Sequence, residues 1–255
     1  SLGGFAGAGV LLVLLKILSL PVNQSIWGLL IVLFIAMVVV SQFMLTFGSD
    51  PNAKVTKKSK SPLSFHPIAL IFGLLSFVSY LVEGAVGDWS ALYLFEDKGI
   101  VIEEAVMGVM LFNGTMCIGR LLGNRLGKHL TSKQVVVGGY LLGSIAMGLI
   151  VFLPGHASMY TYLLLGISLA MIVPNLFSAM GEQNVIPMTQ AVATSTMLGY
   201  MGILMGPALI GFIAHGTSLT VAFIVLTILL VVSAGIGKYA YHLMSKDCGL
   251  SEEQI

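Results

Sequence analysis

Residues 68–80 read IALIFGLLSFVSY, and residues 81–99 continue as LVEGAVGDWSALYLFEDKG. The first stretch is as apolar as a helix that crosses a lipid bilayer, yet Glu83 and Asp88 follow directly in the same run. A charge at bilayer depth costs roughly 2.5–3.5 kcal/mol on insertion scales. The stretch therefore predicts a membrane-spanning helix and raises the question of what two carboxylates do inside it.

The composition of the whole chain indicates an integral membrane protein. Of its 255 residues, 57% are hydrophobic and only 9% are charged, and the mean hydropathy is +0.99. Soluble domains carry about 25% charged residues. The formal net charge of +1 gives no reason to expect nucleic acid as a partner. The two cysteines, Cys117 and Cys248, are too few for a disulfide framework.

A hydrocarbon core about 30 Å thick needs roughly 20 apolar residues for each helix that crosses it. The breaks between apolar runs are mostly short, so consecutive helices are expected to be antiparallel neighbours. The chain opens inside such a run without an initiator methionine, and we expect it to be a piece of a longer protein. The sequence predicts eight spans, near residues 2–20, 25–47, 67–95, 103–124, 134–154, 158–181, 189–215 and 218–244.

The distribution of lysine and arginine predicts the orientation, because these residues mark the cytoplasmic side of a membrane. With the long break at 49–66 in the cytoplasm, only Lys16 and Lys98 fall outside. The C-terminus is then also cytoplasmic. The ten basic residues placed inside are Lys54, Lys57, Lys58, Lys60, Arg120, Arg125, Lys128, Lys133, Lys238 and Lys246.

Three stretches resemble the major facilitator superfamily, and in particular a bacterial branch related to the MosC-type membrane proteins. They are GRLLGNRLGKHL at 119–130, GILMGPALIGF at 202–212 and EGAVGDWSALYL at 83–94. The resemblance implies an all-α polytopic bundle, in which this chain is similar to spans five to twelve. In the family, two six-helix halves are joined by a long cytoplasmic loop.

The resemblance also implies a domain organisation. Residues 1–48 would be the last two spans of an N-terminal bundle and residues 49–66 a basic cytoplasmic linker. A C-terminal six-helix bundle would occupy 67–246, and 247–255 would be a cytoplasmic tail. The N-terminal half that is missing from this chain is then an expected partner, together with membrane lipids.

The first stretch is similar to the family's short loop motif, which implies a gating role at the cytoplasmic end of a span. Asn124, Arg125, Gly127 and Lys128 match the second part of that motif. The sequence departs from it at two positions, with Asn124 in place of aspartate and Arg120 in place of the leading glycine. We expect these five residues to belong to a loop that locks one conformation.

Glu83 lies on a polar stripe of the span at 67–95. Positions three, four and seven apart share a helix face, and this stripe comprises Ser76, Ser79, Tyr80, Glu83, Gly87 and Ser90. A carboxylate at this depth could bind a proton or a substrate group, with Tyr80 beside it. The alternative is a structural glutamate satisfied by Tyr80 or by a neighbouring helix. Asp88 lies on another face, where it either contributes to the site, caps a loop or pairs with Lys98.

Two amides and a glycine pair complete the candidate residues. Asn113 and Asn175 offer hydrogen bonds at mid-depth, either to a substrate or between helices. Asn175 follows Pro174, which frees the carbonyl near Ala170 and predicts a broken helix. Gly202 and Gly206 are spaced four apart and precede Pro207, a pattern typical of close helix packing.

The sequence contains no HExxH or GxSxG motif, and its five histidines are scattered over breaks and span ends. We therefore expect no enzyme, no metal and no cofactor, and any energy source would be an ion gradient. The predicted function is secondary transport of a small polar solute, powered by a proton gradient or by the solute's own gradient, and the family resemblance implies a sugar or sugar derivative as that solute. The alternatives are a membrane sensor that binds without transporting and an inactive truncated transporter. The predicted location is the bacterial inner membrane.

Overall fold

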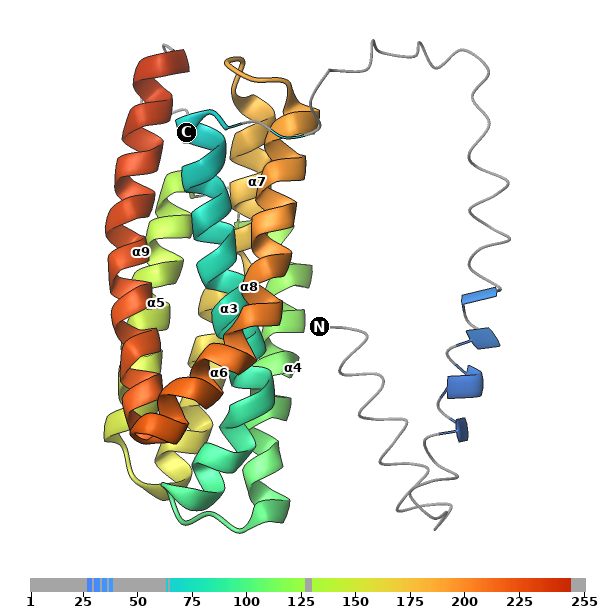
Figure 1. The fold of residues 1–255 in the computed structure, drawn as a ribbon, viewed down its shortest axis with the longest axis vertical. Coiled ribbons are helices and arrows are strands. Elements are labelled where there is room, and N and C mark those ends of the chain that lie inside the picture. Colours follow the sequence, from blue (N-terminus) through green and yellow to red (C-terminus); the bar gives the residue numbers. More distant parts are fainter. Residues whose placement is uncertain are drawn as a thin grey trace. The chain divides into compact units, whose positions relative to one another are not determined.

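The computed structural model describes residues 65–126 and 130–248, together with residue 63 and isolated positions between 27 and 38. Contacts within the chain separate two compact units, Ser1–Lys60 and Ser61–Ile255. In the second unit, the described residues form helices joined by turns (Figure 1). The predicted span at 2–20, most of the one at 25–47, and most of the predicted linker and tail lie outside the described residues, so the count of eight spans stays a prediction.

The described residues of the second unit form seven helices in succession. They are α3 (Pro67–Glu96), α4 (Ile102–Leu126), α5 (Ser132–Phe152), α6 (Gly155–Ala170), α7 (Ile172–Glu182), α8 (Met188–Gly216) and α9 (Leu219–Cys248). Counting α6 and α7 as one crossing, six segments among the described residues are long and apolar enough to span a membrane. They confirm the six spans predicted between 67 and 244, with ends that differ by at most three residues.

The crossing at Gly155–Glu182 is broken into α6 and α7 at Met171. Pro174 has no backbone N–H, so the carbonyl of Ala170 loses its partner one turn earlier and the helix cannot continue regularly. The Asn175 side chain donates to the Met171 carbonyl at 2.8 Å. The broken helix is thus held by an amide that lies immediately after the proline.

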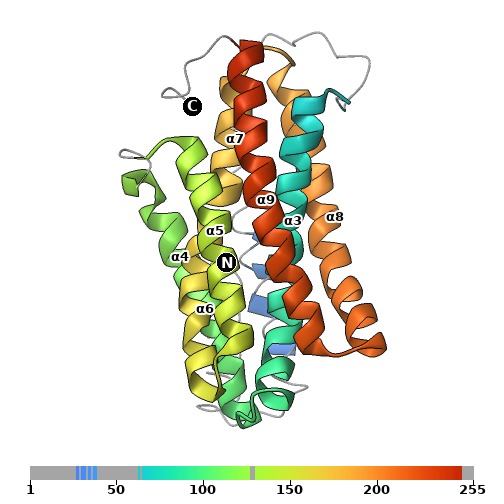
Figure 2. The ribbon, with the colours of Figure 1, turned by 90° about the vertical axis from the view of Figure 1, so that its left-hand side faces the viewer.

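Helix α3 is the centre of the bundle and contacts α4, α6, α7, α8 and α9. Both views place it between α9 and α8 (Figures 1 and 2). Against α9 it packs buried aromatic rings at two levels. Phe72 meets Tyr241 edge to face with 5.4 Å between ring centroids, and Tyr93 stacks on Phe223 at 4.3 Å. Such pairs stabilise a core beyond the area that they bury.

Against α8, the packing of α3 depends on glycine. A Cβ atom on Gly202 would collide with the backbone carbonyl of Phe77, and one on Gly206 would collide with that of Leu81. From the other side, a Cβ on Gly84 would lie 2.9 Å from the Ile203 carbonyl oxygen. The two backbones therefore approach more closely than any side chain would allow.

Pro207 takes part in the same contact. Because proline lacks an N–H, the carbonyl of Ile203 has no helical partner, and this is the carbonyl that faces Gly84. One turn further, the Trp89 indole donates to the Pro207 carbonyl at 2.9 Å. The irregular part of α8 is thus covered by α3 through a glycine and a tryptophan.

The turn between α3 and α4 also stabilises the bundle. Lys98 donates to the carbonyls of Val151 and Leu153, at 2.6 and 2.9 Å, where α5 ends. A cation is favourable there because the last carbonyls of a helix have no helical partners and carry partial negative charge. Burial lowers the pKa of the Lys98 ammonium, and the neighbouring Asp97 carboxylate opposes this shift.

The α3–α8 contact predicts a strong difference between two glycine substitutions. In Gly202→Ala the new methyl group meets the Phe77 backbone, which cannot rotate away, so the variant should be destabilised by roughly 1–3 kcal/mol. In Gly235→Ala on α9 the methyl group enters open space, and the helix should be unchanged or slightly stabilised. Thermal unfolding of both variants in detergent tests this. Equal midpoints would contradict the close packing of α3 and α8.

Candidate functional site

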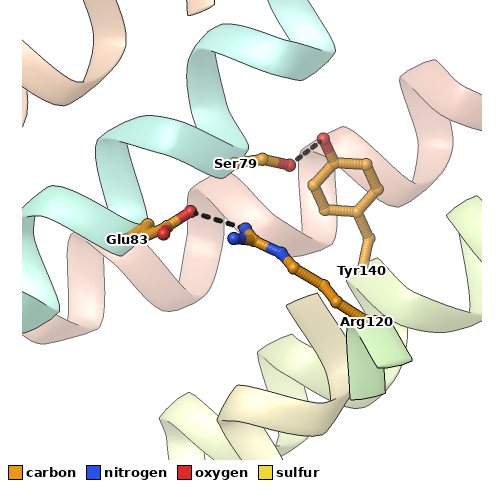
Figure 3. A network of polar contacts seen from close by, with 4 residues as sticks. All are labelled: Ser79, Glu83, Arg120 and Tyr140. Atoms are coloured by element: carbon orange, nitrogen blue, oxygen red, sulfur yellow. Dashed lines mark hydrogen bonds and ion pairs between the residues drawn. The ribbon is translucent and has the colours of Figure 1, made fainter. Parts of the chain in front are cut away.

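The central polar feature of the bundle is an ion pair between Glu83 on α3 and Arg120 on α4. The Arg120 Nη2 atom lies 3.2 Å from Glu83 Oε2 and donates a hydrogen bond to it (Figure 3). Both side chains are only partly exposed, with 30% of Arg120 and 19% of Glu83 accessible. The pair is therefore reachable from the surface of the bundle while most of it is desolvated.

The geometry of two antiparallel helices explains why these residues meet. Glu83 lies near the middle of α3, whereas Arg120 lies close to the end of α4, six residues before Leu126. Side chains on a helix lean toward its N-terminus. In neighbours that run in opposite directions, the two therefore lean toward each other. The long arginine stem spans the remaining distance, and its methylene groups suit an apolar environment.

One turn before Glu83, a second polar contact ties α3 to α5. The Tyr140 hydroxyl donates to the Leu75 carbonyl at 2.6 Å, and it lies 2.8 Å from the Ser79 hydroxyl. Because Tyr140 has one proton, Ser79 must donate to the Tyr140 oxygen. Tyr140 is fully buried, so this contact is closed to solvent and holds the helix that carries Glu83 (Figure 3).

Two tyrosines stand beside the ion pair. Tyr80 is close enough to Glu83 and Arg120 to interact electrostatically with both. Its ring lies parallel to that of Tyr200 on α8, with 6.2 Å between centroids. Gly199 allows this approach, because a Cβ at that position would come within 2.7 Å of the Tyr80 ring. The pair and its immediate surroundings thus combine one carboxylate, one guanidinium and two phenols.

The other predicted binding residues do not converge on this pair. Asp88 is exposed on α3. Lys98, its predicted partner, donates to the carbonyls at the end of α5 instead of pairing with Asp88. The Asn113 amide donates to Val109 in its own helix, at 3.0 Å. Asn175 likewise donates within its helix, and its backbone carbonyl accepts from Ser132 at 3.1 Å.

Asn113 nevertheless lies two turns before Arg120 on the same face of α4, about 10 Å along the helix. Of the predicted binding residues, it is therefore the one that α4 aligns with the ion pair. Its amide would first have to leave Val109 before it could bind a solute.

The residues of the predicted gating loop are only partly described. Arg120 lies inside α4, and its guanidinium contacts Glu83. Asn124 and Arg125 are helical, but their side chains are not described, and Gly127 and Lys128 lie outside the described residues. Gly202, Gly206 and Pro207 lie at the contact between α3 and α8.

The contact between Glu83 and Arg120 was missed by the sequence analysis, which assigned Arg120 to a loop motif. A signal was present: two residues of opposite charge occur in consecutive spans that are expected to be antiparallel. Ionisable residues inside membrane spans usually pair with one another. Within residues 65–126 and 130–248, no group of three or more His, Cys, Asp or Glu side chains is placed to hold a metal ion.

The chain is similar to known membrane proteins over much of its length. No protein-family model matches the chain. The chain is 36% identical over 239 residues to an uncharacterised MFS-type transporter of Yersinia pestis, and the match covers 92% of this chain and 60% of that relative. It is 31% identical over 151 residues to the membrane protein MosC of Rhizobium meliloti. That match covers 59% of this chain and 37% of MosC.

The resemblance to the major facilitator superfamily is confirmed. The chain spans about 60% of the Yersinia relative's length. Its fold is similar to that of the E. coli fucose:proton symporter FucP, with a TM-score of 0.60 and 16% identity over 68% of this chain and 42% of the symporter. At this identity the likeness concerns the fold alone.

The ion pair predicts a selective loss of stability when its acid is neutralised. Glu83→Gln keeps the side-chain shape but leaves the Arg120 charge without its carboxylate, which should cost roughly 1.5–3 kcal/mol. Glu104→Gln is the matched control, because the Glu104 contact with His156 is exposed on both sides and such pairs contribute about 0–1 kcal/mol. Thermal unfolding in detergent measures both. Equal shifts would contradict a structural contribution of the pair.

Proposed function

We propose that this chain forms the solute-binding helical bundle of a secondary transporter that moves a small polar solute across the bacterial inner membrane. The observation that carries the proposal is the half-buried Glu83–Arg120 pair within two helices that are apolar enough to span a membrane. An ion pair that faced lipid would be unfavourable. Its exposed part therefore faces water or a solute, as the wall of a transport pathway does.

The local structure supports this role. Ser79 and Tyr140 fix α3 to α5 one turn from Glu83, whereas Glu83 and Arg120 stay partly accessible. A rigid support beside an accessible polar group is the arrangement that solute recognition requires. Transport is also what the names of the similar proteins describe, an MFS-type transporter and a proton symporter with a similar fold.

In the proposed mechanism, this bundle alternates against a second helical bundle around the bound solute. Glu83 exchanges a proton when the solute binds, and Tyr80 and Asn113 supply hydrogen bonds. We propose a cytoplasmic C-terminus, because ten of the twelve lysines and arginines then fall on the cytoplasmic side. A sugar or sugar derivative is the proposed solute class. The main rival is a membrane protein that binds a ligand without moving it.

Uptake measurements test transport directly. Cells that express the complete coding sequence would receive a pool of sugars, sugar acids, polyols and small amines at acidic external pH, and their internal pools would be measured by mass spectrometry. Accumulation that an uncoupler abolishes is expected for the native protein. Glu83→Gln should abolish the accumulation, and Glu104→Gln should retain it.

The same measurement separates the alternatives. Depletion in place of accumulation would indicate an exporter. Wild-type uptake by Glu83→Gln with unchanged pH dependence would contradict the role of Glu83. If no compound of the pool moves while one of them raises the thermal midpoint of the purified protein, the protein binds without transporting.

A further inference from the structure

Tyr200 is an exposed tyrosine close to the middle of a membrane-spanning helix. It lies two residues before the midpoint of α8, about 3 Å along the helix axis, and 62% of it is exposed. Tyrosines that face lipid are found mainly where the hydrocarbon meets water, because the phenol hydroxyl needs a hydrogen-bond partner. In the middle of α8, water or a solute is therefore a more favourable neighbour for this phenol than lipid.

The exposed side chains of α9 differ from Tyr200 in this respect. The large ones near the middle of that helix are aliphatic, namely Ile228, Val231 and Val232. They carry no polar atom and suit a lipid environment. Of the two helices, α8 is thus the one that exposes a hydroxyl at this depth.

The stack with Tyr80 holds Tyr200 next to the ion pair. The planes of the two rings are parallel within 4°, with 6.2 Å between their centroids. Tyr80 lies three residues before Glu83 on the same face of α3 and interacts electrostatically with Glu83 and Arg120. Because the rings are parallel, Tyr80 can cover only one face of Tyr200, and the opposite face points away from it. A flat aromatic surface therefore adjoins the carboxylate and the guanidinium.

The neighbours of Tyr200 on its own helix extend this surface. Met197 and Leu204 lie three residues before and four residues after it, which places them on the same face of α8. Both are exposed. The site thus has a polar side at the ion pair and an apolar side along α8.

We infer that the exposed ring face of Tyr200 binds the solute, and that the solute contains a saturated ring with an apolar face, as a pyranose sugar does. The inference deepens the proposed function and rests on it. A pyranose carries hydroxyl groups around its edge and C–H groups on its faces. The hydroxyl groups can bond to Glu83 and Arg120 while the C–H groups pack on Tyr200, whose ring face is apolar and weakly negative. Tyr80 is then a positioning residue, which orients Tyr200.

Other solutes fit this arrangement less well. An acyclic polyol offers the same hydroxyl groups but no rigid flat face, so it would use only the polar side of the site. A quaternary ammonium ion binds aromatic faces, but such ions are typically held in cages with rings on several sides. Tyr80 and Tyr200 are parallel and make one wall. The geometry therefore favours a ring-shaped solute.

The first test asks whether Tyr200 faces water or lipid. Tyr200→Cys and Ile228→Cys would be made in the full-length protein, in a background without other cysteines, and treated in membrane vesicles with a charged methanethiosulfonate. Ile228→Cys is the matched control, because Ile228 is 57% exposed. Tyr200→Cys should react at least tenfold faster than Ile228→Cys, since only thiols in contact with water ionise and meet the reagent. D-glucose or D-galactose should slow the reaction.

The outcomes of the labelling are clear-cut. If Tyr200→Cys is as unreactive as Ile228→Cys, Tyr200 faces lipid and the inference is overturned, even if the protein transports a sugar. If Tyr200→Cys reacts but neither sugar slows the reaction, the position faces water without binding a pyranose, which also overturns the inference.

The second test measures transport of D-glucose and D-galactose in proteoliposomes, with the acyclic polyols D-sorbitol and galactitol as competitors. The pyranoses should compete better than the polyols. Tyr200→Phe keeps the ring and should retain the KM within about twofold. Tyr200→Leu should raise the KM for the pyranoses roughly three- to tenfold, the range expected for one aromatic contact, and change kcat less. Tyr239→Leu, at an exposed tyrosine of α9, should behave as the wild type.

These results separate the inference from the proposed function. An unchanged KM in Tyr200→Leu, or polyols that compete as well as the pyranoses, would keep the transporter and overturn the role of Tyr200. A KM that rises as much in Tyr200→Phe as in Tyr200→Leu would assign the effect to the hydroxyl and overturn the ring contact. If no sugar or polyol is transported and none shifts the thermal midpoint, the proposed function for this solute class and the inference fail together.

Discussion

Helix α3 places the carboxylate of Glu83 inside an apolar bundle, and the arginine that pairs with it, Arg120, lies on the next helix, α4. Each charge alone would cost roughly 2.5–3.5 kcal/mol at bilayer depth on insertion scales. Together they neutralise one another at 3.2 Å. This requirement constrains how α3 and α4 align, because the two side chains lean toward each other only in antiparallel helices at this register. The elements around α3 then have to support that register.

They do so by two different kinds of packing. Toward α9, α3 presents large aromatic rings that interlock with those of its neighbour. Toward α8, glycines on both helices bring backbone against backbone, and Trp89 covers the carbonyl of Pro207. Aromatic packing tolerates small shifts of side chains, whereas backbone contacts do not. The α3–α8 contact is therefore the stiffer of the two, and it positions Tyr80 beside Tyr200 next to the ion pair.

The polar side chains discussed above differ in how far they are exposed. Ser79 and Tyr140 are hydrogen bonded and buried, and the amides of Asn113 and Asn175 donate to their own helices. Glu83 and Arg120 retain exposed surface. This difference in exposure is the physical reason why we propose solute recognition at the ion pair. Polar groups that are already bonded inside a helix gain less from a ligand than groups that are half desolvated and accessible.

Much of the helical architecture can be predicted from the sequence. The six spans between 67 and 244 follow from apolar runs of sufficient length, because a bilayer requires a minimum of about 20 residues. The break before Asn175 follows from Pro174, since a missing N–H is a local property. The membrane class and the superfamily resemblance likewise depend on composition and short motifs. The functional importance of Glu83 remains a prediction from its depth and charge.

The partners of these residues were decided by the tertiary structure. Arg120 lies 37 positions from Glu83 in the sequence. From the sequence alone, Arg120 was interpreted as part of the loop motif that immediately surrounds it. Other contacts of this region also join distant parts of the chain. Tyr140 and Tyr200 contact α3, and the end of α5 contacts Lys98 in the turn after α3. Period and composition define which face of a helix is apolar, but not which neighbour covers it, because pairing depends on packing and register among all helices at once. The contacts at Glu83 exist only once the bundle has assembled.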